Sequence, residues 1–331
     1  MVFFSHKIVE KESFMALLRN SGRHVAKNNN KKRAFIFVIT AIILVIVAVG
    51  ATIFFKDMIP NHNESTKETL FVEEKPKVVK KNEFITINDP QLGLIEIKAI
   101  EGFPKSAYNV ENFKIDETGK MTYYIDDEVA SCMGVDLSEY QGDVDFQKLK
   151  DQGFDFVILR IGGRYYSEEG KMYVDTNYHQ YYKKAKEAGL RVGGYFFSQA
   201  KNAEDGMKEA QFVLDSIKGM DFDYPVAFDW EHIDGDTART DNVSSTDLTD
   251  AAIAFCDTIE EAGFESIIYS NTHLVYYEYD LERLKDYDFW IADYEDKPSM
   301  YYNFTMWQYN IEGQVEGIDG NVDLNICLKN Y

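Results

Sequence analysis

Residues 131–331 predict an α/β fold in which eight strands close into a barrel whose final part is irregular. Short apolar runs rich in β-branched and aromatic residues alternate there with amphipathic segments, as in parallel strands joined by crossover helices. Helices fit after only the first five strands, and little chain separates the last three. An open, doubly wound sheet is the alternative, although no GxGxxG turn follows any strand.

The predicted elements of this region follow from its periodicity. Strands are expected over residues 133–138, 154–162, 191–198, 225–231, 265–271, 288–294, 305–310 and 321–327. Helices are expected between the early strands, over residues 145–153, 177–189, 202–219 and 246–264. The last three of these helices have apolar residues at i, i+3, i+4 and i+7, and several end on glycine.

Residues 84–130 predict a small β-rich element. Apolar and polar residues alternate in them, and Glu117, Thr118 and Gly119 are placed to turn a hairpin. We expect this element to pack on the barrel or to lead into it.

The N-terminal part predicts a membrane anchor. Residues 34–55 contain no charge, and at about 1.5 Å per residue they suffice to cross a hydrocarbon core of roughly 30 Å. Residues 1–33 hold most of the flanking positive charge, so the positive-inside rule predicts a cytoplasmic basic tail, a single-pass transmembrane helix and an extracellular remainder. A cleavable signal peptide is the alternative, but its apolar region is shorter. Residues 56–83 are polar and predict a linker.

Charge and cysteine content exclude several functions. The chain carries −21 overall and residues 1–33 carry +6, so the remainder carries −27 and repels nucleic acid. The three cysteines, Cys132, Cys256 and Cys327, form no CxxC and lie near no histidine at metal-ligand spacing, so no metal site is expected. They permit at most one disulfide.

The most informative segment is the D-x-E pair of the fourth predicted strand. Asp229 and Glu231 stand at i and i+2 and therefore project to one face, about 6.6 Å apart along the backbone. Mutual repulsion raises the pKa of at least one, which provides a proton donor beside an anion. Glycoside hydrolysis requires such a pair. Two exposed acids at a strand end are the alternative reading of this motif alone.

Further acids occur near other strand ends. Asp136 ends the first predicted strand, where barrels of this class build their active sites. Asp323 joins that cluster only if the last strand begins at the barrel mouth and runs antiparallel to the first. Asp293 is interpreted as a solvated rim residue.

The sequence resembles glycoside hydrolase family 25, the Chalaropsis-type lysozymes. The matching segments, in family order, are GVDLSEYQGDVDF, FVILRIGGR, GLRVGGYFF, PVAFDWE, IIYSN, FWIADY, MWQY and GNVDLNI. They cover essentially all of 131–331, and nothing comparable covers residues 1–130.

The resemblance implies an irregular TIM-like (β/α)5β3 barrel that cleaves the β-1,4 bond between N-acetylmuramic acid and N-acetylglucosamine in peptidoglycan, without a cofactor. By position, Glu231 corresponds to the general acid/base and Asp229 to the carboxylate that assists through the substrate's acetamido group. Asp136 and Asp323 match two further acids of the family's pocket. Whether cleavage retains or inverts the anomeric configuration stays open.

Sugar-binding candidates come from the same motifs. Aromatic rings stack on sugars and amide groups bond their edges, so Tyr195, Tyr269, Trp307 and Gln308 are the expected substrate-binding residues, with packing as the alternative role of each. The tyrosines of 178–182 are expected to pack within a helix.

A pairing of cysteines is a further hypothesis. If the first and last strands are antiparallel neighbours with Asp136 and Asp323 at the mouth, Cys132 and Cys327 meet at the opposite end of the barrel. Outside the membrane a disulfide could form there and would crosslink the first and last strands of the barrel. Two buried free thiols are the alternative.

Two other functions compete with an active muramidase. One is a catalytically silent scaffold that binds the wall, and the other is a chitinase-like hydrolase. A free phage endolysin is disfavoured by the expected anchor. Partners in a cell-envelope assembly, and the oligomeric state, stay unknown.

Overall fold

The computed structural model describes residues 83–331, which belong to one compact unit running from Glu68 to Tyr331. The predicted basic tail, the transmembrane helix at 34–55 and nearly all of the linker at 56–83 lie outside the described residues. Across residues 83–331, no helix has both the length and the apolar character that crossing a bilayer requires.

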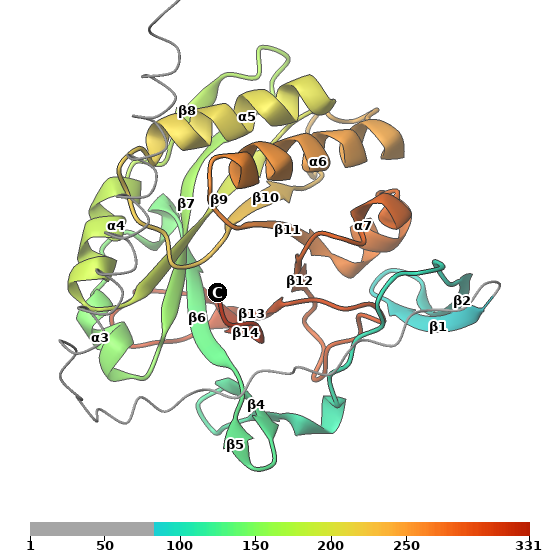
Figure 1. Ribbon diagram of the computed structural model, residues 1–331. Helices are drawn as coiled ribbons and strands as arrows, with labels where there is room; N and C mark the ends of the chain where they lie inside the picture. Colours follow the sequence, from blue (N-terminus) through green and yellow to red (C-terminus); the bar gives the residue numbers. More distant parts are fainter. Residues whose placement is uncertain (1–82) are drawn as a thin grey trace, which may run out of the picture. The chain divides into compact units, whose positions relative to one another are not determined.

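Eight strands form a closed barrel, as the sequence predicts (Figure 1). Their order around the barrel is β6, β14, β13, β12, β11, β10, β9 and β7, and β6 pairs again with β7. The strands span Cys132–Leu137 (β6), Phe156–Arg164 (β7), Arg191–Ser198 (β9), Val226–Trp230 (β10), Ser266–Asn271 (β11), Phe289–Ala292 (β12), Met306–Gly313 (β13) and Val322–Cys327 (β14). An open sheet is thereby excluded.

Four helices occupy the predicted places. They span Phe146–Asp151 (α3), Tyr178–Glu187 (α4), Ala203–Ser216 (α5) and Ser245–Glu261 (α6), and α5 and α6 lie side by side outside the barrel (Figure 1). Asn202 and Ser244 cap α5 and α6 by accepting bonds from backbone N–H groups of the first turn. Tyr178 and Tyr181 are buried, as expected for helix packing.

Four short elements outside the β-rich element were not predicted, and one of them is a 3-10 turn, η2, at Glu139–Gln141. The strand β8 (Met172–Val174) pairs antiparallel with the end of β7, the helix α7 (Thr272–Tyr277) follows β11, and a 3-10 turn, η3, spans Leu281–Leu284. Each is too brief to show a periodicity in sequence.

The last strand reverses direction, and this reversal positions two acids. β14 runs antiparallel to both β13 and β6, whereas the other barrel strands run parallel to their neighbours. Asp323 stands directly opposite Asp136. The last strand therefore runs antiparallel to the first, as the prediction that Asp323 joins the acid cluster required.

The same register places Cys327 opposite Cys132, at the other end of the two strands. Both side chains belong to a buried cluster with residues such as Phe156 and Trp290. The cysteines therefore meet as expected, but the structure holds them as free thiols and no disulfide joins them.

Close packing of the barrel requires a small residue on β6. A Cβ atom built on Gly134 would lie 2.3 Å from the ring of Phe156, a separation that real atoms do not tolerate. The glycine thus admits the Phe156 ring, which stacks on Tyr224 at 4.4 Å between centroids.

The β-rich element consists of two small sheets. Strands Phe84–Asp89 (β1) and Gly93–Lys98 (β2) pair antiparallel, and Phe113–Ile115 (β3), Met121–Ile125 (β4) and Glu128–Val129 (β5) form a second sheet after the turn η1 (Val110–Asn112). The predicted hairpin is present between β3 and β4, with Gly119 at a φ of 82°.

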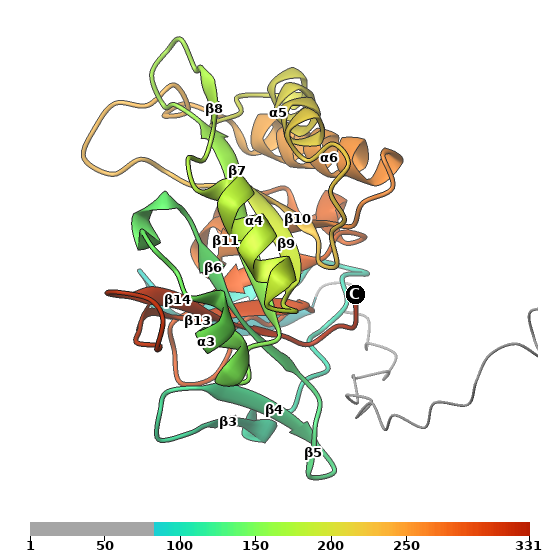
Figure 2. The same ribbon diagram turned by 90° about the vertical axis from the view of Figure 1, so that its left-hand side faces the viewer.

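This element packs on the barrel (Figure 2). The Tyr108 hydroxyl donates to the Phe304 carbonyl at 2.9 Å, and the Met121 N–H donates to the Tyr309 hydroxyl at 3.1 Å. Residues far apart in sequence are thereby joined into one unit.

Candidate active site

A cavity of about 270 Å³ opens at the barrel mouth, where the parallel strands end and β14 begins. All four predicted catalytic acids line it: Asp136, Asp229, Glu231 and Asp323. They come from β6, from β10 and the residue just beyond it, and from β14. Strand ends far apart in sequence therefore bring four carboxyl groups into one small space.

The first acid, Asp136, is held by two amide groups. Its Oδ2 accepts bonds from Gln308 Nε2 at 2.9 Å and from Asn325 Nδ2 at 2.8 Å. Burial raises the pKa of Asp136, and these bonds partly offset the rise because they stabilise the anion. The Asp136 carboxylate is thus fixed in position by donors.

Its partner, Asp323, has its pKa raised by burial and further by the charge of Asp136. The two acids face each other across paired strands, so one of them tends to keep a proton. Gln308 Nε2 also lies 3.5 Å from Asp323 Oδ2.

The D-x-E pair projects into the cavity from β10. Burial, and next the charge of Glu231, raise the pKa of Asp229 well above its usual range. Asp229 Oδ1 is buried and has no hydrogen-bond partner among the described residues. Burial and the charge of Asp136 also raise the pKa of Glu231, whereas a hydrogen bond with Tyr269 lowers it. Glu231 is only partly buried, so its carboxyl group is accessible from the cavity.

Three of the four predicted substrate-binding residues line the cavity: Tyr195, Tyr269 and Gln308. Gln308 is buried, and its Oε1 accepts bonds from the hydroxyls of Tyr269 and Tyr294, both at 2.8 Å. Its amide nitrogen is therefore oriented toward Asp136, which assigns Gln308 a role in holding that acid.

The prediction for Trp307 is wrong. Its side chain points away from the barrel interior and is fully buried beneath the β-rich element. Its ring packs edge-on against Phe113 at 5.4 Å between centroids, and its Nε1 donates to the Asp293 carbonyl at 2.6 Å. Neighbouring residues on a strand face opposite sides, and Gln308 takes the inner side. The tryptophan that lines the cavity is Trp290 of β12, and its Nε1 donates to Asn325 Oδ1 at 2.9 Å.

Asp293 is also not the solvated rim residue that was expected. It is buried, and its Oδ2 accepts a bond from the Ser299 N–H at 2.6 Å. The carboxylate therefore organises the turn that follows β12.

Sequence reasoning missed a cation in the wall of the cavity. Arg160 on β7 lines the cavity, and its guanidinium forms ion pairs with Asp175 at 2.7 Å and with Glu139 at 3.1 Å. The segment FVILRIGGR, in which Arg160 is the only buried charge before the strand end, was the available signal.

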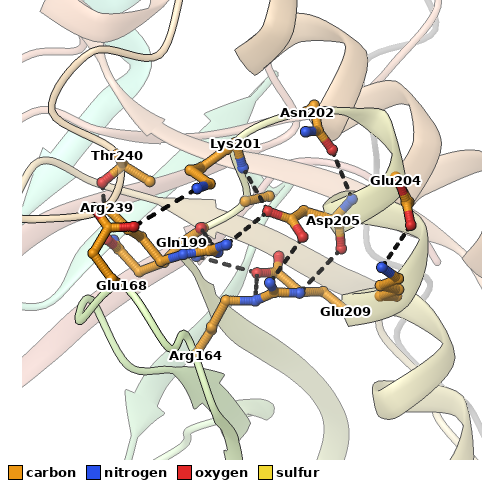
Figure 3. Close-up of polar contacts among 12 residues, drawn as sticks. Arg164, Glu168, Gln199, Lys201, Asn202, Glu204, Asp205, Glu209, Arg239 and Thr240 are labelled. Carbon is orange, nitrogen blue, oxygen red and sulfur yellow. Dashed lines mark hydrogen bonds and ion pairs between the residues drawn. The ribbon is translucent and has the colours of Figure 1, made fainter.

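Figure 3 shows a second group of charged side chains, which includes Arg164, Asp205, Glu209 and Arg239. Glu209 on α5 accepts a bond from the Ser198 hydroxyl at 2.6 Å and pairs with Arg164 Nε at 2.7 Å. Arg164 also pairs with Asp205 at 3.0 Å. Burial raises the pKa of Glu209 to about 7.

This group is connected to the residue that follows β10 through one amide side chain. Asp205 pairs with Arg239 at 3.1 Å, and Arg239 donates to the Gln199 carbonyl at 2.6 Å. Gln199 Nε2 in turn donates to the backbone carbonyl of Glu231 at 3.2 Å. The buried ion pairs therefore fix the backbone that carries Glu231.

Among residues 83–331, no group of three His, Cys, Asp or Glu side chains has the geometry to hold a metal ion. The chemistry that the described residues offer is proton transfer and charge stabilisation by carboxyl groups within a pocket that partly excludes water.

The buried acids predict that the free energy of unfolding falls as pH rises from about 4 to about 8. Asp136, Asp323 and Glu209 have pKa values raised above the value of about 4 expected in the unfolded chain, so the folded state binds more protons in this window. Acids with lowered pKa values, such as Asp205, titrate below it. We expect a Tm about 3 °C or more lower at pH 8 than at pH 5, measured by calorimetry.

The variant Asp323→Asn, which cannot titrate at this position, should show a smaller difference between the two pH values. A Tm that is equal or higher at pH 8 in the unmodified chain would contradict the assignment of raised pKa values.

Comparison with known proteins places residues 135–318 in a match to the family model "Glycosyl hydrolases family 25". A curated relative, the autolytic lysozyme of Clostridium acetobutylicum, is 31% identical over 194 residues, which cover 58% of this chain and 54% of the relative. The chain thus spans about half the length of that relative.

Solved structures share the fold. The spore cortex lytic enzyme SleM of Clostridium perfringens aligns with a TM-score of 0.52 at 25% identity, over 61% of this chain and 68% of that protein. A family 25 glycosyl hydrolase of Bacillus anthracis aligns with a TM-score of 0.51 at 22% identity, over 63% and 93% of the two chains. The barrel described above is therefore the architecture of these proteins.

Proposed function

Because the chain belongs to glycosyl hydrolase family 25, we propose that it is a peptidoglycan hydrolase, a Chalaropsis-type lysozyme that cleaves the β-1,4 bond between N-acetylmuramic acid and N-acetylglucosamine. The single observation that carries this proposal is the convergence of four carboxyl groups in one pocket at the barrel mouth. A relative named as a lysozyme supports the same activity.

In the proposed mechanism Glu231 is the general acid/base. Burial raises its pKa and so favours the protonated carboxyl group, and that proton passes to the leaving glycosidic oxygen. Because Glu231 is partly exposed to the cavity, it can reach a bound sugar.

Asp229 is proposed to assist through the 2-acetamido group of the substrate. Its Oδ1 has no partner among the described residues, so it is free to accept a bond from the acetamido N–H. That bond orients the acetamido carbonyl toward the reacting carbon, where it stabilises the oxocarbenium-like centre. Asp136 and Asp323 are proposed to shape the electrostatics of the same pocket.

Digestion of purified peptidoglycan by the full-length chain in detergent tests this function. We expect reduced products that end in N-acetylmuraminitol, identified by mass spectrometry. Binding to the wall without cleavage would support the silent scaffold instead, and release of reducing ends from chitin but not from peptidoglycan would support the chitinase-like alternative.

We also propose that residues 34–55 anchor the chain in the cell membrane, with residues 1–33 in the cytoplasm and the barrel outside. The uncharged stretch and the positive charge before it support this arrangement. Proteinase added to intact spheroplasts should digest the barrel but spare an N-terminal epitope tag. Loss of the tag, or survival of the barrel until the cells are lysed, would refute this topology.

A further inference from the structure

A second cavity, of about 820 Å³, lies on the side of the barrel covered by the β-rich element. Its buried floor is formed by Phe113, Met121 and Tyr309, and its rim by residues 294–297 after β12 and 310–312 of β13. We call this cavity the rim groove. Residues 113–121 lie outside the segment that matches the family model, so the rim groove is built in part from the β-rich element.

The rim groove adjoins the catalytic pocket. Tyr294 lines the rim groove and donates through its hydroxyl to Gln308, which lines the catalytic pocket and holds Asp136. One tyrosine side chain thus links the two cavities. A substrate that extends from the catalytic pocket past Tyr294 enters the rim groove.

The walls of the rim groove are held together by direct bonds. Lys297 Nζ donates to the Val110 carbonyl at 2.8 Å and lies 3.6 Å from Glu111, which ties the loop after β12 to the β-rich element. The bond from the Met121 N–H to the Tyr309 hydroxyl closes the floor. The groove is therefore formed before any ligand binds, which lowers the entropic cost of binding.

The exposed surface of the rim groove combines apolar and charged groups. Ile115 is 61% exposed, Tyr294 52% and Ile311 46%, and such exposed apolar side chains gathered in one groove are typical of a binding site. Lys114, Glu295, Asp296 and Glu312 also line it, and none forms an ion pair with another described residue.

This composition favours a charged peptide over a further run of sugar. A neutral glycan would leave the positive and negative side chains of the groove without partners of opposite charge. A short peptide offers methyl groups, carboxylates and an ammonium group. Peptidoglycan carries such a peptide on the muramic acid residue itself, beside the bond to be cleaved.

We infer that the rim groove binds the stem peptide of peptidoglycan. The acidic side chains of the groove, Glu295, Asp296 and Glu312, face the ammonium group of the peptide. Lys114 faces a peptide carboxylate, and Ile115 and Ile311 contact alanine methyl groups. This inference rests on the proposed function. It assigns the β-rich element a part in substrate choice.

Two substrates test it: soluble, uncross-linked glycan strands, and the same strands after an amidase has removed their peptides. The full-length chain in detergent should cleave the peptide-bearing strands with the higher kcat/KM. In the double variant Ile115→Asn/Ile311→Asn we expect kcat/KM on peptide-bearing strands to fall about ten-fold, with no change on stripped strands. Lys114→Gln should also lower the ratio of kcat/KM on peptide-bearing strands to kcat/KM on stripped strands.

A matched control replaces two exposed leucines of the β-rich element that lie away from the groove, Leu92→Asn/Leu94→Asn, and should leave both rates unchanged. Equal rates on the two substrates, or an equal loss on both in the isoleucine variant, would overturn the inference while leaving the hydrolase intact. Inactivity of the unmodified chain on both substrates would overturn the proposed function and this inference with it.

Discussion

Glu231→Gln should reduce the release of reducing ends from peptidoglycan by a factor of about 10² to 10⁴, the usual contribution of a general acid. Glutamine has nearly the shape of glutamate but no proton to give at neutral pH. The backbone at this position is held by Gln199, so the substitution should leave the strand in place. Because binding does not need the proton, retention of the variant on the wall should persist.

The matched control is Asp234→Asn, which removes a carboxylate three residues away that is exposed and does not line the cavity. We expect it to retain most of the activity. Activity of Glu231→Gln within a few-fold of the unmodified chain, measured on the same peptidoglycan, would exclude Glu231 as the general acid.

The second large effect concerns stability. Arg164→Met should lower the free energy of unfolding by about 3–5 kcal/mol, because it leaves the buried Glu209 without its cation. Arg164 is almost fully buried, and it also pairs with Asp205, so one substitution breaks two ion pairs. Urea unfolding followed by circular dichroism measures the change.

Two comparisons isolate the cause. The double variant Arg164→Met/Glu209→Gln should recover part of the loss, because an amide at residue 209 needs neither a cation nor a bound proton to be neutral. Lys208→Met removes an exposed pair with Glu204 on the same helix and should change stability by about 0.5 kcal/mol or less. A loss for Lys208→Met as large as that for Arg164→Met would show that burial of the pair is not decisive.

The barrel could be predicted from sequence because each strand has its own apolar run bounded by turns, and eight such runs leave few arrangements. The register of Asp136 with Asp323 followed from one assumption, the reversal of the last strand, and the structure meets it. The hairpin at Gly119 followed from its turn residues in the same way.

Which face of a strand looks inward was harder to predict. Trp307 and Gln308 were both expected to bind substrate, yet adjacent residues of a strand face opposite sides, so at most one of them could reach the cavity. The choice depends on the register of β13, which contains irregularities after Gln308 that no local pattern announces.

The buried ion pairs were beyond sequence reasoning for a different reason. Arg164 ends β7, Asp205 lies in the first turn of α5, and Arg239 lies in the loop after β10. Their separations in the chain, 41 residues for the first pair and 34 for the second, match no helical or strand period. Asp293 was predicted to be a solvated rim residue for a similar reason. The backbone N–H that binds its carboxylate belongs to Ser299, six residues later, in a turn that the sequence pattern does not reveal.

The reversal of β14 has a consequence for biosynthesis. Asp136 is fixed by Asn325, which the ribosome adds 189 residues later, a delay on the order of 10 to 40 s at typical rates of elongation. Until β14 has been synthesised, the chain lacks Asp323 and one of the two amides that bind Asp136. The group of four carboxyl groups in the pocket is thus complete only when the last strand has joined the barrel.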